Sequence, residues 1–325
     1  MVTIPGPMST HTPEAPTTQR YRLVTRSDFD GLVCAALLKS LGMLDEVKFV
    51  HPKDVQDGKV DIGPGDITTN LPYAPGAHLS FDHHGSEMVR VADRPDNRVI
   101  DPDADSAARV VYGHFGGATR FPGISAEIMA AVDKADSASF SIHEILHPEG
   151  WILMSFLMDP RTGLGRFRDF RISNYDLMMQ LIDECTSKSV EEILDTRDVR
   201  ERVDLYCEHA DRAADQIERC STVRGNLVVL DLRAEETIHP TNRFTIYALF
   251  PDQNISMHVL SGLKGRNTVF AVGKSILDRT SATDVGSLML EYGGGGHEAA
   301  GTCQVENADA ARVQYELAGR ITADG

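Results

Sequence analysis

Short apolar runs that end in polar turns recur along the first third of the chain. Residues 21–25, 47–50 and 66–70 read as strands from their β-branched and aromatic residues. A helical run rich in Ala and Leu, residues 32–41, follows the first strand after an acidic turn. Because strand, acidic turn and helix in this order open a parallel α/β unit, the pattern predicts an α/β fold.

The middle of the chain has a helical period and precedes a second region of strands. Residues 151–220 are mainly helical, and residues 197–220 are charged and amphipathic, as expected of one long helix that links two lobes. Four further apolar runs read as strands: residues 226–232, 245–250, 255–260 and 268–272. We therefore predict two α/β domains joined by a helix.

Composition restricts the compartment and the partners. The 325 residues suffice for two hydrophobic cores, and residues 1–19, rich in Pro, Thr and Ser, form a predicted disordered tail. The net charge of −16 argues against broad binding to long duplex DNA. Five widely spaced cysteines without a CxxC pair favour a reduced, cytoplasmic protein, and no apolar run reaches membrane-spanning length.

The clearest chemical signal is Asp82-His83-His84, which follows an apolar approach at residues 79–81. Consecutive side chains can converge where a strand ends, at the edge of an open α/β sheet that binds ligands. Carboxylate oxygen and imidazole nitrogen together suit Mn, Fe, Zn or Co. The alternative is a pair of ordinary surface histidines before a turn.

Two acidic pairs strengthen the expectation of a metal site. Asp28 and Asp30 follow the first strand, where an Asp-x-Asp pair presents hard oxygen ligands to a divalent cation. Capping of the next helix by one of them is the alternative role. Asp133 and Asp136 follow another apolar helical run, residues 126–132.

Two further segments are suited to contact an anion. The glycines from Gly293 to Gly296, directly before His297, free the backbone for unusual dihedrals and for close approach of a phosphate. A flexible linker is the alternative interpretation of this run. A second segment is either a substrate-facing basic loop or a solvated charge run. It contains Arg161, Arg166, Arg168 and Arg171.

Together these motifs resemble the DHH phosphoesterase superfamily with its DHH-associated C-terminal domain, which includes oligoribonuclease-like and exopolyphosphatase-like members. The residues that carry the resemblance are 27–31, 82–84, 133–136 and 293–301. The resemblance implies a doubly wound parallel-sheet catalytic domain, a linker helix and a smaller C-terminal α/β domain that binds substrate. The corresponding boundaries are residues 20–190, 191–222 and 223–325.

The resemblance also implies a metal centre that holds one or two ions of Mn²⁺, or of Mg²⁺ or Co²⁺. Asp28 would bind the first ion, and Asp30, His83 and Asp136 would bind the second. Asn70 ends the strand where the family supplies an aspartate that bridges both ions.

Other residues would act on the substrate, if the family pattern holds. Asp82 and His84 would be catalytic, with His84 facing the phosphate. The substrate's phosphate would be held by residues of the second domain: Lys274, Gly294, Gly295, Gly296 and His297.

The chain departs from the family pattern at the first metal site. Where the family has a metal-binding histidine or aspartate, the chain has Thr25 and Arg26. Asn70 is a neutral and weaker ligand than the bridging aspartate. His51, at the end of the neighbouring strand, is a candidate replacement ligand. These departures weaken the first site most and leave the second site complete.

The leading hypothesis is therefore a metal-dependent phosphodiesterase that cleaves short oligonucleotides or linear or cyclic dinucleotides. One alternative is an exopolyphosphatase, which the basic segment favours and the net charge of −16 disfavours. Another is a degenerate protein that binds a nucleotide with little turnover. The expected partners are a small phosphorylated substrate or short single-stranded nucleic acid, with no membrane contact and with a homodimer left open.

Overall fold

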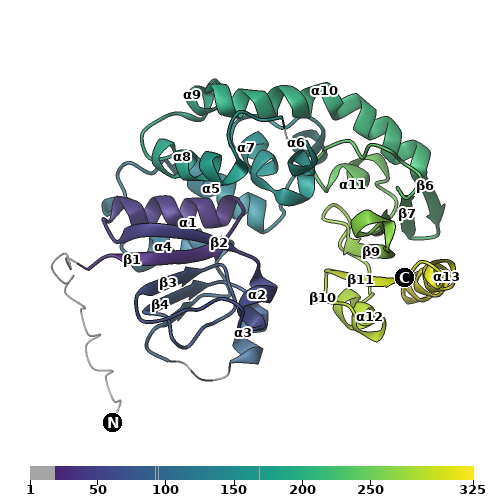
Figure 1. The fold of residues 1–325 in the computed structure, drawn as a ribbon, viewed down its shortest axis with the longest axis horizontal. Coiled ribbons are helices and arrows are strands. Elements are labelled where there is room, and N and C mark those ends of the chain that lie inside the picture. The colour runs from purple at the N-terminus through teal and green to yellow at the C-terminus, as the bar shows by residue number, and fades with distance from the viewer. Residues whose placement is uncertain (1–18, 92, 94, 168) are drawn as a thin grey trace, which may run out of the picture.

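The computed structural model describes residues 19–325 except residues 92, 94 and 168, so residues 1–18 of the predicted tail lie outside the described residues. Two β-sheets lie at opposite ends of the long helix α10 (Arg197–Cys220), which arches over both lobes in Figure 1. The predicted α/β class, with a first parallel sheet and a second smaller α/β lobe, is confirmed. The long helix expected at residues 197–220 is also confirmed.

The first sheet is parallel throughout, with the order β2-β1-β3-β4-β5. Its strands are β1 (Tyr21–Arg26), β2 (Leu44–Val50), β3 (Asp66–Thr69), β4 (Leu79–Asp82) and β5 (Arg98–Ile100). The central strands are almost entirely buried, as expected when helices cover a parallel sheet.

Helices and short 3₁₀ turns fill the rest of this lobe. The helices are α1 (Phe29–Ser40), α2 (Pro52–Gln56), α3 (Gly85–Arg90), α4 (Ala107–His114), α5 (Ala126–Asp136), α6 (Ile142–Leu146), α7 (Gly150–Met158), α8 (Asn174–Glu184) and α9 (Val190–Leu194). The 3₁₀ turns are η1 (Gly117–Thr119), η2 (Pro160–Thr162) and η3 (Leu164–Arg166). Helix α1 is buried over most of its length and packs against α4, α5 and α8.

The second sheet has the order β10-β11-β9-β8-β7-β6 and is antiparallel except for the β7–β8 pair. Its strands are β6 (Ser221–Arg224), β7 (Leu227–Asp231), β8 (Ile255–Ser261), β9 (Asn267–Lys274), β10 (Gly295–His297) and β11 (Ala300–Glu306). The remaining elements of this lobe are α11 (Thr245–Leu249), η4 (Leu263–Gly265), α12 (Val285–Glu291) and α13 (Ala310–Asp324).

An apolar cluster joins the two lobes. Phe140 and Phe156 of the first lobe pack with Val228, Leu230 and Phe244 of the second, and all five side chains are buried. The segment between β7 and α11 therefore lies against the first lobe and brings its polar residues to the junction. Among the described residues, the helices are too short or too polar to cross a bilayer.

One predicted element is wrong. Residues 245–250, expected as a strand, form the short helix α11. The run Thr-Ile-Tyr-Ala-Leu-Phe is rich in β-branched and aromatic residues, but so short an apolar run does not distinguish a strand from a buried helix.

A smaller difference concerns α5, which continues to Asp136, so that Asp133 and Asp136 lie in its last turns and not beyond its end.

Candidate active site

Three neighbouring strands of the first sheet end at the same edge. β1, β3 and β4 run parallel in adjacent positions, so their carboxyl ends meet. Asp28 follows β1, Asn70 follows β3, and His83 and His84 follow β4. This is the edge at which open α/β sheets bind ligands.

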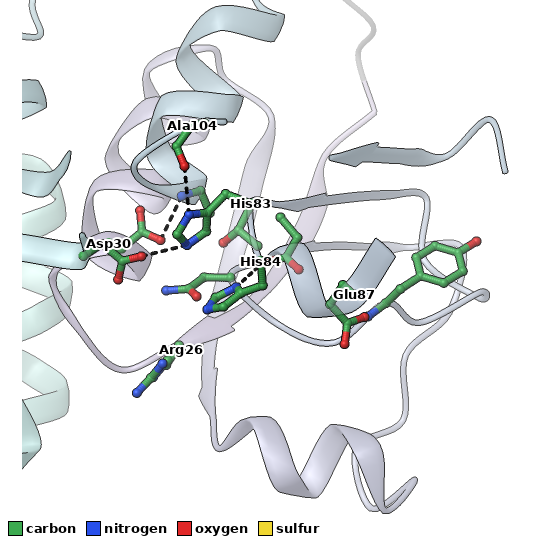
Figure 2. Close-up of polar contacts among 12 residues, drawn as sticks. Arg26, Asp30, His83, His84, Glu87 and Ala104 are labelled. Carbon is green, nitrogen blue, oxygen red and sulfur yellow. Dashed lines mark hydrogen bonds and ion pairs between the residues drawn. The ribbon is translucent and has the colours of Figure 1, made fainter. Parts of the chain in front are cut away.

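Asp30, His83 and Asp136 form a compact group of metal-binding side chains. One ligand atom of each lies within 4.8 Å of those of the other two. Figure 2 shows the ring of His83 pointing toward Asp30. The two oxygens of Asp30 accept backbone N–H groups of Ala107 and Ala108 at 3.1 and 2.8 Å, so the start of α4 holds this carboxylate in place.

The imidazole of His83 has the orientation of a metal ligand. Its Nδ1 lies 3.1 Å from the carbonyl oxygen of Ala104 (Figure 2), so Nδ1–H donates there and Nε2 is the nitrogen that can bind a metal ion in place of a proton. Nε2 is buried and lies 2.7 Å from Oδ2 of Asp136 without hydrogen-bond geometry. One nitrogen and two carboxylates around a common point fit a divalent ion such as Mn²⁺.

The electrostatics of the group favour a cation. Burial raises the pKa of Asp30 well above its ordinary value, and the nearby Asp136 and Asp28 add to the shift. Burial alone would lower the pKa of His83, but Asp136 and Asp30 outweigh burial and raise it. Burial likewise opposes ionisation of Asp136, yet His83 holds the pKa of this carboxyl below its ordinary value. The carboxylates that attract a proton to this group also attract a metal ion.

Asp28 has other partners. Its Oδ1 accepts the N–H of Gly31 at 3.0 Å, which caps α1, and lies 3.4 Å from Nδ2 of Asn70. Its Oδ2 lies 2.9 Å from Nε of Arg26. Burial raises the pKa of Asp28, and Arg26 opposes that shift. The carboxylate therefore caps a helix and pairs with a guanidinium, and it does not belong to the group of three.

Asn70 and Asp82 leave buried oxygens without partners. Asn70 has a φ of 55°, a conformation that residues other than glycine rarely adopt. Its Oδ1 and the Oδ2 of Asp82 are buried and have no hydrogen-bond partner among the described residues. The Oδ1 of Asp82 lies 2.7 Å from Nδ1 of His84, whose side chain is 43% exposed. Strained backbone and unpaired acceptors are typical of a functional site.

The glycine run belongs to the edge of the second sheet. A Cβ atom at Gly294 or Gly296 would lie 2.0 or 2.3 Å from a backbone oxygen of β11, so these positions need glycine for close strand packing. A Cβ at Gly295 would meet nothing within 4 Å. Among the four glycines, a positive φ is found at Gly293, at 74°, so the expectation of unusual dihedrals holds at that position alone.

His297 lies on β10, the edge strand of the second sheet. Burial lowers the pKa of His297, and the nearby His84 and Arg243 lower it further. Lys274 lies 3.2 Å from the exposed carboxylate of Glu298, so its ammonium group already has a partner.

A small cavity, partly open to solvent, adjoins the metal-binding group. Asp28, Asp30 and Asp136 line one part of it, and Arg161, Arg243 and Phe244 line another. Arg161 belongs to the basic segment singled out in the sequence. Arg243 was missed, because no motif or charge run surrounds it.

Other candidates from the sequence lie elsewhere. Arg171 pairs with Asp198 of α10, and Arg168 lies outside the described residues. His51 is exposed and accepts the N–H of Lys53 at the start of α2, so it is not in the metal-binding group.

Comparison with known proteins gave no matching family model and no matching curated protein. Among solved structures, the chain is similar to PggH, a pGpG-specific phosphodiesterase from Vibrio cholerae. The two are 57% identical over 94% of this chain and 100% of that chain, with a TM-score of 0.83. CDC45 from Entamoeba histolytica shares the fold alone, at 8% identity over 93% of this chain and 95% of that chain and a TM-score of 0.51. RecJ from Thermus thermophilus in complex with Mn²⁺ is more distant, at 15% identity over 94% of this chain and 52% of that chain and a TM-score of 0.46.

Proposed function

The chain belongs to the DHH phosphoesterase superfamily, and on this premise we propose that it hydrolyses the phosphodiester bond of a linear dinucleotide that carries a 5′-phosphate. It is a metal-dependent phosphohydrolase. The observation that carries the proposal is the 57% identity, over 94% of the chain, to a phosphodiesterase specific for pGpG. The alternatives of an exopolyphosphatase and of a protein with little turnover gain no comparable support.

We assign the catalytic ion to Asp30, His83 and Asp136, whose ligand atoms lie within 4.8 Å of one another. Our choice of ion is Mn²⁺, which suits a mixed nitrogen and oxygen donor set. When bound there, it supplies Lewis acidity toward a phosphoryl oxygen. We assign no ion to Asp28, because Arg26 already supplies a positive charge 2.9 Å from its carboxylate.

The residues around this ion have distinct proposed roles. Asp82 holds Nδ1 of His84 at 2.7 Å, which leaves Nε2 free to donate a hydrogen bond to the phosphate. His297, on the facing edge of the second sheet, would contact the same phosphate, and the backbone N–H groups of the glycine run would support it. Lys274 would contribute only after it separates from Glu298.

Compartment and assembly also belong to this proposal. All five cysteines are free thiols, which supports a reducing compartment such as the cytoplasm. A homodimer, which the sequence left open, would be tested by light scattering of the purified protein.

A direct assay tests the proposed reaction. Purified protein loaded with Mn²⁺ would be incubated separately with pGpG, with a cyclic dinucleotide and with polyphosphate, with the His83→Ala variant as the control. We expect conversion of pGpG to GMP at a rate well above those for the other two substrates, and no conversion by the variant. Release of orthophosphate from polyphosphate without cleavage of pGpG would refute the proposal.

A further inference from the structure

Two arginines from different lobes meet in the cavity beside the metal-binding group. Arg161 lies in η2, directly after α7, and Arg243 lies just before α11. Figure 1 shows α7 and α11 near each other beneath α10. The segment that carries Arg243 is fixed to the first lobe, because the neighbouring Asn242 donates hydrogen bonds to the carbonyl of Ile145 and the hydroxyl of Tyr206 at 2.9 and 3.0 Å.

One carboxylate holds both guanidinium groups. Asp159 lies 2.8 and 3.1 Å from Nε of Arg161, and its Oδ2 lies 3.5 Å from Nε of Arg243. The Arg243 guanidinium also stacks on the ring of Phe244, with 4.3 Å between its central carbon and the ring centroid. Asp159 therefore contacts both arginines and holds their side chains in place.

Most N–H groups of this pair have no acceptor within the part of the chain that the structure describes. Nε of Arg243 is buried without a hydrogen-bond partner, and among the described residues none accepts a hydrogen bond from the terminal nitrogens of either arginine. Burial lowers the pKa of Arg243 to about 10, with Arg161 adding to the shift, so the side chain stays charged at neutral pH. Solvent reaches 46% of the Arg161 side chain and 32% of the Arg243 side chain, so a ligand can reach these donors. Guanidinium donors without a protein partner favour an anionic ligand with several acceptor oxygens.

We propose that Arg161 and Arg243 form a clamp for the terminal 5′-phosphate of the substrate, separate from the site that holds the scissile phosphate. The scissile group must lie at the metal-binding group, whose carboxylates Asp30 and Asp136 line the same cavity. A phosphomonoester carries about two negative charges and three acceptor oxygens at neutral pH, and guanidinium forks match this geometry. The clamp thus selects a linear, 5′-phosphorylated dinucleotide over one without that phosphate. This inference rests on the proposed function for its choice of substrate.

A substrate pair tests the clamp. pGpG and GpG contain the same phosphodiester bond and differ in the 5′-phosphate alone. Wild type should prefer pGpG, and Arg243→Gln should lower kcat/KM for pGpG roughly 10- to 100-fold while it changes that for GpG less than about threefold. Arg243→Lys, which keeps the charge without the fork, should fall between the two. Arg279→Gln is the matched control, because Arg279 also bridges the lobes, at the carbonyls of Ser137 and Ala138, but lies outside the cavity lining.

Two outcomes in this assay would overturn the clamp. Equal losses on both substrates would place Arg243 at the scissile phosphate, and unchanged kinetics would leave it without a role in binding. A binding measurement decides the inference independently of turnover: titration calorimetry of pGpG and GpG against metal-free wild type and metal-free Arg243→Gln, so that neither dinucleotide is cleaved. Wild type should bind pGpG at least tenfold more tightly than GpG, and the variant should lose most of this difference. Equal affinities in wild type would refute the clamp, whereas failure to cleave either dinucleotide would refute the proposed function.

Discussion

Arg26 and Arg22 lie at the two ends of β1, and each pairs with a buried aspartate, so each serves as the control for the other. Nε of Arg26 lies 2.9 Å from Asp28, and Nε of Arg22 lies 2.7 Å from Asp66. The two arginine side chains are 34% and 29% exposed. The Arg26 pair alone lies at the sheet edge that carries the metal-binding group.

The two replacements should cost comparable stability, with Arg22→Met the larger because Arg22 also donates to the carbonyl of Asp61. Removal of one partner from a fully buried ion pair costs about 3–5 kcal/mol, whereas an exposed pair contributes about 0–1 kcal/mol. Because solvent reaches about a third of each arginine, we expect Arg26→Met and Arg22→Met each to lower the free energy of unfolding by about 1–2 kcal/mol. Urea unfolding can be followed by the fluorescence of Trp151, which is the single tryptophan and is buried in α7.

Only Arg26→Met should change metal binding. Without Arg26, the Asp28 carboxylate would lack its cation, and a second Mn²⁺ would gain a ligand. Titration calorimetry should find one tight Mn²⁺ in wild type and in Arg22→Met, and a second, weaker Mn²⁺ in Arg26→Met. Two tight ions in wild type, or identical titrations for the two variants, would refute the view that Arg26 supplies the charge compensation at Asp28.

Three further perturbations separate local roles. Asn70→Asp adds a carboxylate at a position where the amide lies 3.4 Å from Asp28. The metal-free variant should lose up to about 4 kcal/mol of its free energy of unfolding and should recover it when Mn²⁺ is added. A melting temperature of the variant that does not change with Mn²⁺ would contradict this. Gly296→Ala should lower the melting temperature by roughly 4–8 °C, because its Cβ would lie 2.3 Å from a backbone oxygen. Gly295→Ala, whose Cβ would meet nothing within 4 Å, should not lower it. Equal melting temperatures for the two variants would refute the packing argument. Burial opposes ionisation of Glu87, but its arginine partner and a backbone N–H lower its pKa below the ordinary 4.5. The stabilisation by the Glu87 carboxylate is therefore complete above pH 4.5 and is lost as the pH falls through its lower pKa in the folded protein. Glu87→Gln should flatten the dependence of the free energy of unfolding on pH in that range. An acid titration of stability that is the same in the variant and in wild type would contradict this role of Glu87.

The parts of the fold with a long or repeated pattern could be predicted from the sequence. The strand–turn–helix order around Asp28 and the amphipathic period of residues 197–220 are local signals, and the structure has both elements. Residues 245–250 failed because their burial against Phe140 and Phe156 of the other lobe, not their propensity, decides their conformation.

At the candidate site too, some features follow from local sequence motifs and others only from the folded structure. Asp30, His83 and Asp136 could be named from motifs, although only the fold shows that their ligand atoms converge. The cap made by Asp28 was one of two open roles, and its pairing with Arg26 depends on side-chain orientation at the end of β1. Arg243 could not be found from sequence, because its contact with Asp159 joins residues far apart in the chain.

The central claim is that a single catalytic ion lies between Asp30, His83 and Asp136. Anomalous diffraction from crystals grown with Mn²⁺ tests it most directly. We predict one strong manganese peak within coordination distance of Nε2 of His83 and of a carboxylate oxygen of Asp30 and Asp136, and no peak between Asp28 and Arg26. A peak bound to Asp28, or no peak at the group of three, would contradict the assignment.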